Sequence, residues 1–543
     1  MVPGTTGAWL LARSLREAGV RTIFALPGEH IDPFLEAAPH EGLRVITTRH
    51  EEAAVLAAEG WALATGEVGV AAVTAGPGLA NALPGMVEAQ AAGAPALVIA
   101  GRTGIAQRGR GAVQDLDQLA LVAPTTKWRA ECLSTPRIPA YAAAALHRAR
   151  AGAPGVAYLE VPLDVLAAHA EPPPSEHPTG PPAEPVRAAP PPADVARAVE
   201  LLASAERPVA LAGSGAFFSG AAEALRAFAE RTGIPVITTS AARGLLDDEH
   251  PRCVGGLVHG GIAVASADAC LVLGSRFDAN LLYGGAPLFP AGQRVVQVDI
   301  RPEHLGGSRR PDLALAGDVA ATLEALAAAW STPPAAFDAW NEEAQRATDA
   351  SRASWEREAE RPARGLHPGW VAREVVRFAA SRGPHTFVTD GGDSVVWGIA
   401  MARARRPGTH LTIGSAMGTL GVGLPFALAA RAARPAEPVY LFTGDGAFGM
   451  TAMELETAAR HGLGVLVVVA NNGPWREPSP IRHDLLARAV GGHGERVEDP
   501  GDLAPALERA ARAAEERPAV VDAVVDPSVV SEFMRNMAAL ELM

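Results

Sequence analysis

Short apolar runs recur along the chain, and many are followed by a segment in which apolar residues return every three or four positions. Runs of this length that are rich in β-branched residues predict buried strands, whereas the longer period predicts amphipathic helices. In the first part of the chain the predicted strands are residues 22–26, 45–48, 70–74, 96–100 and 156–162, and the predicted helices include residues 9–18 and 51–65. Strands that alternate with helices predict a parallel α/β sheet.

The same alternation is found twice more. The later predicted strands are residues 208–212, 235–239, 269–274 and 295–299, and then 388–390, 439–443 and 463–470, with helices at 450–460 and 485–490. Proline-rich residues 169–193 and polar, charged residues 329–369 separate the three parts and are predicted to be linkers. We therefore predict an α/β protein of three consecutive doubly wound parallel-sheet domains, at residues 1–168, 194–328 and 370–528, followed by a tail at 529–543.

Composition narrows the class of protein. The 543 residues are 48% hydrophobic and 20% charged, as in ordinary globular proteins. A net charge of −13 argues against nucleic acid or an anionic membrane as the main partner. The three cysteines are too widely spaced for a disulfide framework or a zinc site. The N-terminal 20 residues have a helical, amphipathic pattern and no apolar run is long enough to span a membrane, so we expect a cytoplasmic protein.

The most specific motif lies in the third domain. A strand leads into Gly444-Asp445-Gly446, 24 residues follow, and the next strand ends on Asn471-Asn472. A right-handed crossover brings both strand ends to one edge of a parallel sheet, where such folds bind ligands. The carboxylate of Asp445, the amide oxygen of Asn472 and a loop carbonyl suit Mg²⁺, and the amides of Gly446 and Ala447 suit a phosphate. The GDG triplet on its own is equally typical of an ordinary turn with a capping aspartate. The spacing of 24 residues to the Asn pair makes the motif specific.

Around this motif the chain resembles a known family over nearly its whole length. The matching segments include LPGEH, RHEE, TAGPGLAN, AVQDLDQ, PTTKW, YLEVPLD, GSRFD, VDIRPEH, MGTLGVGLP and GDGAFGMTAMELETAARHG. They are similar to the acetolactate synthase-like thiamine-diphosphate enzymes, a family that also contains 2-oxo acid decarboxylases and oxalyl-CoA decarboxylases. The resemblance implies that the first domain binds the aminopyrimidine and the third the diphosphate with Mg²⁺. It also implies a homodimer or homotetramer with active sites between chains, and a central domain that holds FAD, ADP or nothing.

The resemblance also implies roles for individual residues. Glu51 matches the glutamate that hydrogen-bonds the aminopyrimidine ring, although Glu51 and Glu52 would also complement a helix macrodipole without any further role. Asp445, Asn472 and the carbonyl of Pro474 match the metal ligands. Leu420 matches the bulky residue that bends the cofactor, with plain core packing as the alternative. The other residues matched to the cofactor site are Gly76, Pro77, Asn81, Gly392, Asp393, Ser394, Met417, Gly444, Gly446, Ala447 and Trp475.

The expected reaction is decarboxylation of a 2-oxo acid with carboligation of the enamine. The segment GRTGIAQRGRGAVQD lacks the histidines that pyruvate decarboxylases carry, which favours ligation. Glu29 and His30 lie in a turn where decarboxylases carry an acid, so a non-ligating decarboxylase or a 2-hydroxyacyl-CoA lyase stays open. Gln114 and Lys127 match positions near the substrate channel, with solvated surface as the alternative. The short segment after Asn472 keeps a third hypothesis open, a catalytically inactive cofactor-binding subunit.

Overall fold

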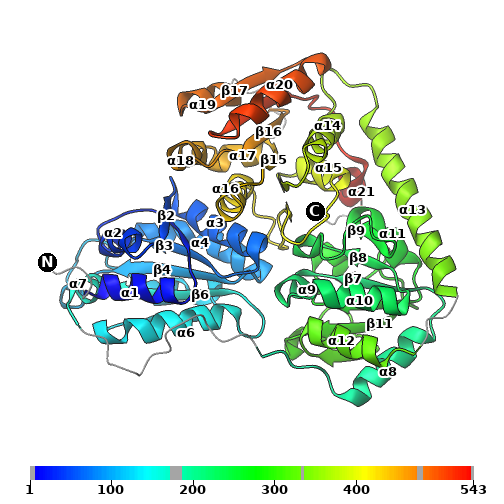
Figure 1. The fold of residues 1–543 in the computed structure, drawn as a ribbon, viewed down its shortest axis with the longest axis horizontal. Coiled ribbons are helices and arrows are strands. Elements are labelled where there is room, and N and C mark those ends of the chain that lie inside the picture. The colour runs from blue at the N-terminus through cyan, green and yellow to red at the C-terminus, as the bar shows by residue number, and fades with distance from the viewer. Residues whose placement is uncertain (1–5, 171–185, 332–335, 474–480, 540–543) are drawn as a thin grey trace. The chain divides into compact units, whose positions relative to one another are not determined.

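Three six-stranded parallel sheets make up the computed structural model, which confirms the predicted fold class (Figure 1). The structure describes residues 6–170, 186–331, 336–473 and 481–539. By contacts the chain divides into two compact units. The first contains Met1–Pro185, Met417–Ala436 and Thr451–Gly464, and the second contains the remaining segments. Among the described residues, no helix combines the length and the apolar character needed to cross a bilayer.

The N-terminal sheet has the strand order β2-β1-β3-β4-β6-β5. Its strands are β1 (Thr22–Ala25), β2 (Arg44–Thr47), β3 (Gly69–Val73), β4 (Ala96–Arg102), β5 (Trp128–Glu131) and β6 (Val156–Pro162). Its helices are α1 (Gly7–Glu17), α2 (Asp32–His40), α3 (Glu51–Thr65), α4 (Pro77–Ala92), α5 (Gln118–Leu121), α6 (Ile138–Arg150) and α7 (Leu163–Ala167). α1 and α6 cover one face of the sheet, and α3 and α4 cover the other (Figure 1).

The central sheet has the order β12-β11-β10-β7-β8-β9. Its strands are β7 (Pro208–Ala212), β8 (Val236–Thr238), β9 (Cys253–Gly256), β10 (Ala269–Leu273), β11 (Arg294–Asp299) and β12 (Leu313–Ala316). Its helices are α8 (Pro192–Ala203), α9 (Ser214–Phe218), α10 (Ala222–Thr232), α11 (Leu257–Ser266) and α12 (Val319–Ala329). β9 and β12 were not predicted, because Cys253–Gly256 and the half-exposed Leu313–Ala316 lack a long apolar run.

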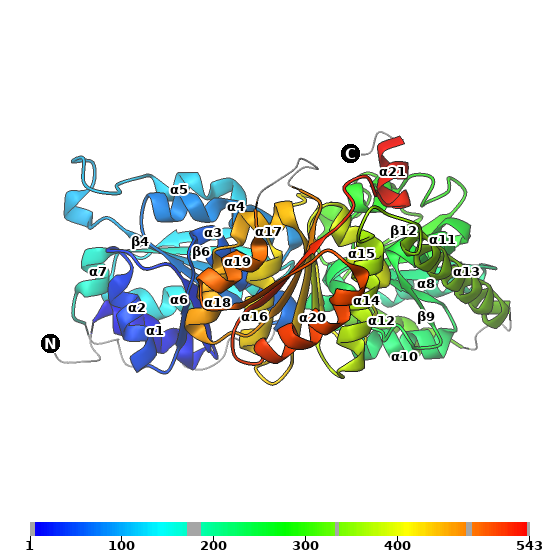
Figure 2. The same cartoon turned by 90° about the horizontal axis from the view of Figure 1, so that it is seen from above.

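The C-terminal sheet has the order β14-β13-β15-β16-β18-β17, and α14 and α20 cover one of its faces (Figure 2). Its strands are β13 (Thr386–Asp390), β14 (His410–Leu411), β15 (Val439–Gly444), β16 (Leu466–Asn471), β17 (His493–Val497) and β18 (Ala519–Val524). The helices from residue 336 onward are α13 (Ala336–Ala359), α14 (Pro368–Ser381), α15 (Asp393–Met401), α16 (Gly423–Ala433), α17 (Asp445–Thr451), α18 (Glu454–His461), α19 (His483–Ala489), α20 (Pro500–Ala513) and α21 (Glu532–Ala539). Of these, α16 and α18 belong to the first compact unit.

Two predictions of local structure need correction. The segment at 329–369, predicted as a linker, contains the 24-residue helix α13, whose buried side chains include Phe337, Trp340, Ala344 and Trp355. Apart from the buried Glu358, its charged residues are exposed or half-buried, and they masked the apolar stripe in the sequence. The single helix predicted at 450–460 is two helices, α17 and α18. The proline-rich linker at 169–193 lies mostly outside the described residues, and α8 begins within its end.

Candidate active site

Close packing of α3 on α4 positions Glu51. α3 is rich in alanine and almost wholly buried, and α4 presents glycines to it. A Cβ on Gly85 would lie 2.9 Å from the carbonyl oxygen of Glu52, and one on Gly78 would lie 3.4 Å from Oε1 of Glu51. These small residues let the two helices approach closely, so the first turn of α3 lies against the start of α4.

The carboxylate of Glu51 is buried and has a defined partner. Its side chain is 7% exposed, and Nδ2 of Asn81 donates to Oε2 at 3.1 Å. Two residues that the sequence analysis assigned to the cofactor site are therefore brought together. Gly76 begins α4 with φ +62°, a conformation that favours glycine, and Pro77 follows it at the first helical position.

Gln118 is a buried organising residue that the sequence analysis did not single out. Its Oε1 accepts from the amide of Gly76 at 2.9 Å, and its Nε2 donates to the hydroxyl of Tyr158 and to Oε2 of Glu160, each at 3.0 Å. The side chain is fully buried, so it holds the turn before α4 in place. In the sequence, its importance was indicated only by its position in AVQDLDQ, one of the segments that resemble the family.

Gln114 lies beside the same turn. A Cβ on Gly76 would be 2.8 Å from Cβ of Gln114, and Gln114 itself has φ +60°. Its Oε1 is buried without a hydrogen-bond partner in the described residues. Lys127 has a different environment, because its ammonium donates to the carbonyls of Ala151 and Ala153 at 2.8 and 2.5 Å. Lys127 therefore fastens the end of α6.

In the turn after β1, the adjacent residues Glu29 and His30 have different environments. Glu29 is exposed, whereas His30 is 5% exposed and its backbone packs on Gly101 at the end of β4. The amide of His30 donates to Oγ1 of Thr74 at 3.3 Å, and its ring Nδ1 is buried without a partner in the described residues. An unpaired buried imidazole nitrogen is costly, and it is available to exchange a proton with a bound molecule.

In the C-terminal sheet, β13 and β15 are neighbours and their ends bring Ser394 to Gly444. The hydroxyl of Ser394 donates to the carbonyl of Asp390 at 2.9 Å, and a Cβ on Gly444 would lie 2.8 Å from it. Gly392 precedes α15, and Asp393 begins it. Oδ2 of Asp393 accepts from Nε1 of Trp397 at 3.1 Å and from the amide of Ser531 at 3.0 Å, so this oxygen anchors the tail.

Asp445 and Asn472 lie side by side at the ends of β15 and β16. One atom of the Asn472 amide is 3.1 Å from Oδ1 of Asp445 and 3.0 Å from the carbonyl oxygen of Gly473. As a nitrogen, this atom donates to both; as an oxygen, it completes a set of three converging oxygens that requires a cation between them. Oδ2 of Asp445 is buried without a partner in the described residues, which also fits a cation.

The local electrostatics of Asp445 agree with this arrangement. Burial raises the pKa of Asp445, although hydrogen bonds from the backbone of Asn472 and Gly446 act in the opposite direction. No group of three or more His, Cys, Asp or Glu side chains that could hold a metal occurs in the described part of the chain. A cation here would therefore depend on one carboxylate together with amide and carbonyl oxygens. Pro474 and Trp475, which were also predicted to contribute, lie outside the described residues.

The remaining predicted residues fall into both units. Gly446 and Ala447 form the first turn of α17, and Ala447 is buried. Met417 and Leu420 belong to the unit that contains Glu51, where Met417 is exposed and Leu420 half-buried. In the central domain, where a nucleotide could bind at the strand ends, the ends of β7, β10 and β11 have internal partners. A Cβ on Gly215 would lie 2.7 Å from Cα of Gly274, and Asp299 accepts from the amide of Arg301 at 2.8 Å.

Comparison with known protein families defines the class. Models of the thiamine pyrophosphate enzymes match all three domains: the N-terminal thiamine pyrophosphate-binding domain at residues 5–121, the central domain at 195–326 and the C-terminal thiamine pyrophosphate-binding domain at 390–523. The protein is thus an enzyme of the thiamine-diphosphate-dependent class.

Similar proteins place the chain within that class. A probable acetolactate synthase of Mycobacterium bovis is 36% identical over 552 residues, with 97% of each chain covered. The human 2-hydroxyacyl-CoA lyase 2 is 34% identical over 510 residues, which cover 86% of this chain and 79% of the human protein. A 2-hydroxyacyl-CoA lyase of Arabidopsis thaliana is 30% identical, with 98% of each chain covered. The chain belongs to the acetolactate synthase-like family of thiamine-diphosphate-dependent enzymes, as the motifs predicted.

Proposed function

We propose that the protein uses thiamine diphosphate and Mg²⁺ to decarboxylate a 2-oxo acid and to ligate the remaining acyl unit to a second carbonyl compound. The observation that carries the proposal is the buried carboxylate of Glu51, held at the start of α3 by Asn81. Similarity to a probable acetolactate synthase over 97% of the chain supports ligation as the second step.

The residues on each unit have distinct tasks in this reaction. When bound, thiamine diphosphate supplies a nucleophilic carbon and an electron sink for the loss of CO₂. Oε1 of Glu51 receives no hydrogen bond from the described residues, so it is available to share a proton with a ring nitrogen of the cofactor. Asp445, Asn472 and the carbonyl of Gly473 would hold Mg²⁺, whose charge offsets that of the diphosphate.

The proposal includes assembly into a homodimer or homotetramer. Several large apolar side chains of both units are exposed, and such residues are commonly covered in an interface. They are Met417, Met450, Met453, Ile481 and Leu485, with exposed fractions of 47–58%. Sedimentation of the cofactor-loaded protein tests this part, and a monomer that binds the cofactor tightly would contradict it.

Product analysis tests the reaction. The purified protein is incubated with pyruvate, with and without thiamine diphosphate and Mg²⁺, and the products are analysed by circular dichroism and chromatography. Optically active acetolactate or acetoin that requires both cofactors is the expected result. Turnover of bulkier 2-oxo acids alone would keep the reaction and change the substrate. Tight cofactor binding with no turnover of any 2-oxo acid or acyl-CoA would favour an inactive cofactor-binding subunit.

A second candidate is a non-ligating decarboxylase or a 2-hydroxyacyl-CoA lyase. The buried, unpartnered Nδ1 of His30 favours it, because a placed proton donor promotes release of an aldehyde over ligation. Incubation with benzoylformate, oxalyl-CoA and a 2-hydroxyacyl-CoA separates the two candidates. If release dominates, His30→Gln should lower the rate of product release, whereas the control His40→Gln, at an exposed residue of α2, should leave it unchanged.

A further inference from the structure

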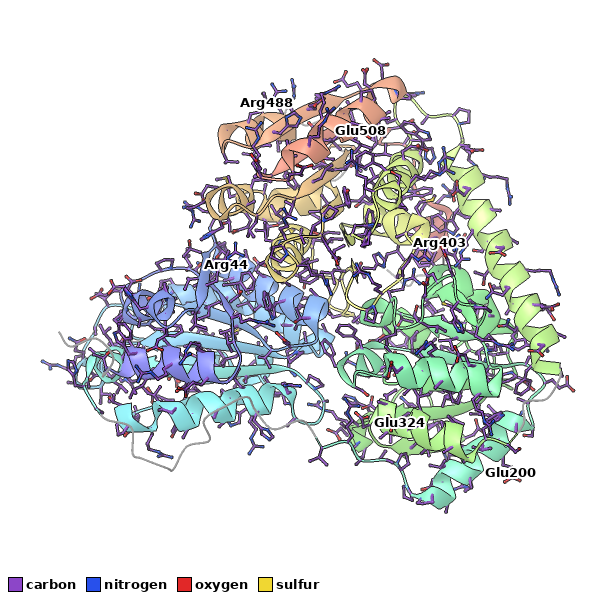
Figure 3. All side chains as sticks on the ribbon, in the orientation of Figure 1. Arg44, Glu200, Glu324, Arg403, Arg488 and Glu508 are labelled. Atoms are coloured by element: carbon purple, nitrogen blue, oxygen red, sulfur yellow. The ribbon has the colours of Figure 1, made fainter. Side chains whose placement is uncertain are left out.

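The free edge of the N-terminal sheet is covered by side chains of α18. β2 (Arg44–Thr47) pairs with β1 on one side, and among the described residues no strand pairs with its other edge. Nε2 of His461 accepts from the amide of Thr47 at 2.9 Å, and Arg460 donates to the Thr47 carbonyl at 2.8 Å. Arg44, labelled in Figure 3, donates to the carbonyl of His461 at 3.3 Å. α18 therefore takes the place that a neighbouring strand would occupy.

Glu454 extends this contact into the loop between β2 and α3. Its carboxylate accepts from the amide of Arg49 at 3.0 and 3.2 Å and from the amide of His50 at 3.1 Å. The hydroxyl of Thr457 donates to the same carboxylate at 2.6 Å. Glu454 is 1% exposed, so these donors replace water around a buried acid. The two amides belong to the residues directly before Glu51.

The arrangement reproduces a helix cap with a residue from elsewhere in the chain. His50 is the N-cap of α3, and in a capping box a glutamate at the third helical position accepts from the N-cap amide. That position in α3 is Ala53, which has no acceptor. Glu454 supplies the missing carboxylate across a sequence separation of 404 residues. Burial raises the pKa of Glu454, and the hydrogen bonds from Thr457, Arg49 and His50 act in the opposite direction.

We propose that Glu454 is a positioning residue for Glu51. Glu454 fixes the Arg49–His50 backbone, and Asn81 fixes the Glu51 carboxylate. Both the backbone before Glu51 and its side chain are therefore held in place. The inference rests on the proposed role of Glu51. It also means that the helix just after the Gly444-Asp445-Gly446 motif sets the geometry of the acid in the N-terminal domain, because α18 and Glu51 lie in one compact unit.

Backbone amide exchange in the cofactor-free protein tests the contact without any turnover. In Glu454→Ala, peptides that contain Arg49 and His50 should exchange faster, whereas peptides from the middle of α3 should be unchanged. Glu454→Gln keeps one acceptor and should show a smaller change. The control Glu36→Gln removes a charge from an exposed position of α2 in the same unit, outside this contact. It should leave the exchange as in the unmodified protein.

Steady-state kinetics then tests the consequence for the reaction. Loss of fixed geometry should lower kcat about 10–100-fold in Glu454→Ala, because small displacements of a reacting group are this costly. KM should change little, since Glu454 touches neither the cofactor site glycines nor the Asp445 side of the motif. Glu454→Gln should recover part of kcat, and such a rescue is not expected if the residue only fills space.

A double-mutant cycle distinguishes action through Glu51 from a separate effect. If Glu454 acts by placing Glu51, then Glu51→Gln combined with Glu454→Ala should be no slower than Glu51→Gln alone. Fully multiplicative losses would overturn the proposal, as would unchanged exchange at Arg49 and His50. If Glu51→Gln itself retains full activity, the proposed function fails, yet the exchange experiment still decides whether Glu454 holds the loop. Should Glu454→Ala not fold, Glu454→Gln and Thr457→Val replace it in each measurement.

Discussion

The Glu51 half of the candidate cofactor-binding residues lies in the first unit and the Asp445 half in the second, and the two hold their acids in different ways. Glu51 is fixed by hydrogen-bond donors, from Asn81 on its side chain and from the loop that Glu454 caps. One atom of the Asn472 amide lies 3.1 Å from Oδ1 of Asp445 and 3.0 Å from the carbonyl oxygen of Gly473, and the second oxygen of Asp445 has no partner in the described residues. In the first half, hydrogen-bond donors of the protein hold the acid. In the second half, oxygen atoms converge as they would around a cation. Substitutions should therefore impair the two halves differently.

Glu51→Gln should have the largest effect on turnover. The amide cannot share a proton in the same way, so kcat should fall by about 10²–10⁴-fold, the range of general acid–base catalysis. Binding of thiamine diphosphate, followed by tryptophan fluorescence, should change much less. Glu52→Gln is the matched control, because it removes the same charge from the same helical turn. Equal losses in both variants would mean that only the helix dipole matters.

Asp445→Asn should act on metal-dependent binding before it acts on chemistry. Removing the one carboxylate of the oxygen set should weaken Mg²⁺-dependent binding of the cofactor by at least about tenfold, or about 1.4 kcal/mol. The rise in Tm on adding Mg²⁺ and thiamine diphosphate should shrink accordingly. Asp499→Asn, at an exposed residue of the same unit, should keep the full rise. A normal rise in Asp445→Asn would place the metal elsewhere.

Gln118→Leu should destabilise the first half without touching the second. The substitution removes a hydrogen-bond partner from the amide of Gly76 and another from the buried Tyr158–Glu160 pair. Each loss should lower the free energy of unfolding by about 1–3 kcal/mol. Urea unfolding followed by circular dichroism measures the loss. The exposed Gln107→Leu is the control and should leave the unfolding midpoint unchanged. An equal midpoint for Gln118→Leu would show that water replaces its hydrogen bonds.

The elements that carry the two acids could largely be predicted from the sequence. Periodicity located α3 and β6 at their observed bounds, and the spacing from Asp445 to Asn472 predicted two neighbouring strand ends. These predictions succeeded because they depend on local pattern and on the handedness of βαβ connections. The family motifs assigned both Glu51 and Asn81 to the cofactor site, but the hydrogen bond between them was not predicted, since nothing in the local pattern requires it.

Residues whose partners are distant in sequence could not be predicted in this way. Glu454 falls within the helix predicted at 450–460, yet its side chain is buried against a loop 404 residues away in the sequence. Gln118 looks like one polar residue in a loop, although it is fully buried. Burial of a polar side chain depends on tertiary packing, and hydropathy along the chain carries no information about the donors that will surround it.

Glu59→Gln should have the smallest effect and a distinctive dependence on pH. Glu59 lies within α3, is fully buried, and neither carboxylate oxygen has a partner in the described residues. Burial, and then the charge of Glu88 on α4, raise the pKa of Glu59 well above its ordinary value of 4.5. The folded protein therefore binds this proton more tightly than the unfolded chain, and the stability that it contributes is lost as pH rises above 4.5 towards the folded pKa.

The glutamine variant is neutral at every pH and should escape this loss. Urea unfolding of both proteins should give similar free energies at mildly acidic pH, with the variant becoming the more stable as the pH is raised. Glu36→Gln, at an exposed residue of α2, serves as the control and should differ from the unmodified protein by a constant amount. A constant difference for Glu59→Gln as well would mean that Glu59 titrates normally in the folded protein. A widening difference would show that the folded protein keeps Glu59 protonated through its burial and the nearby charge of Glu88.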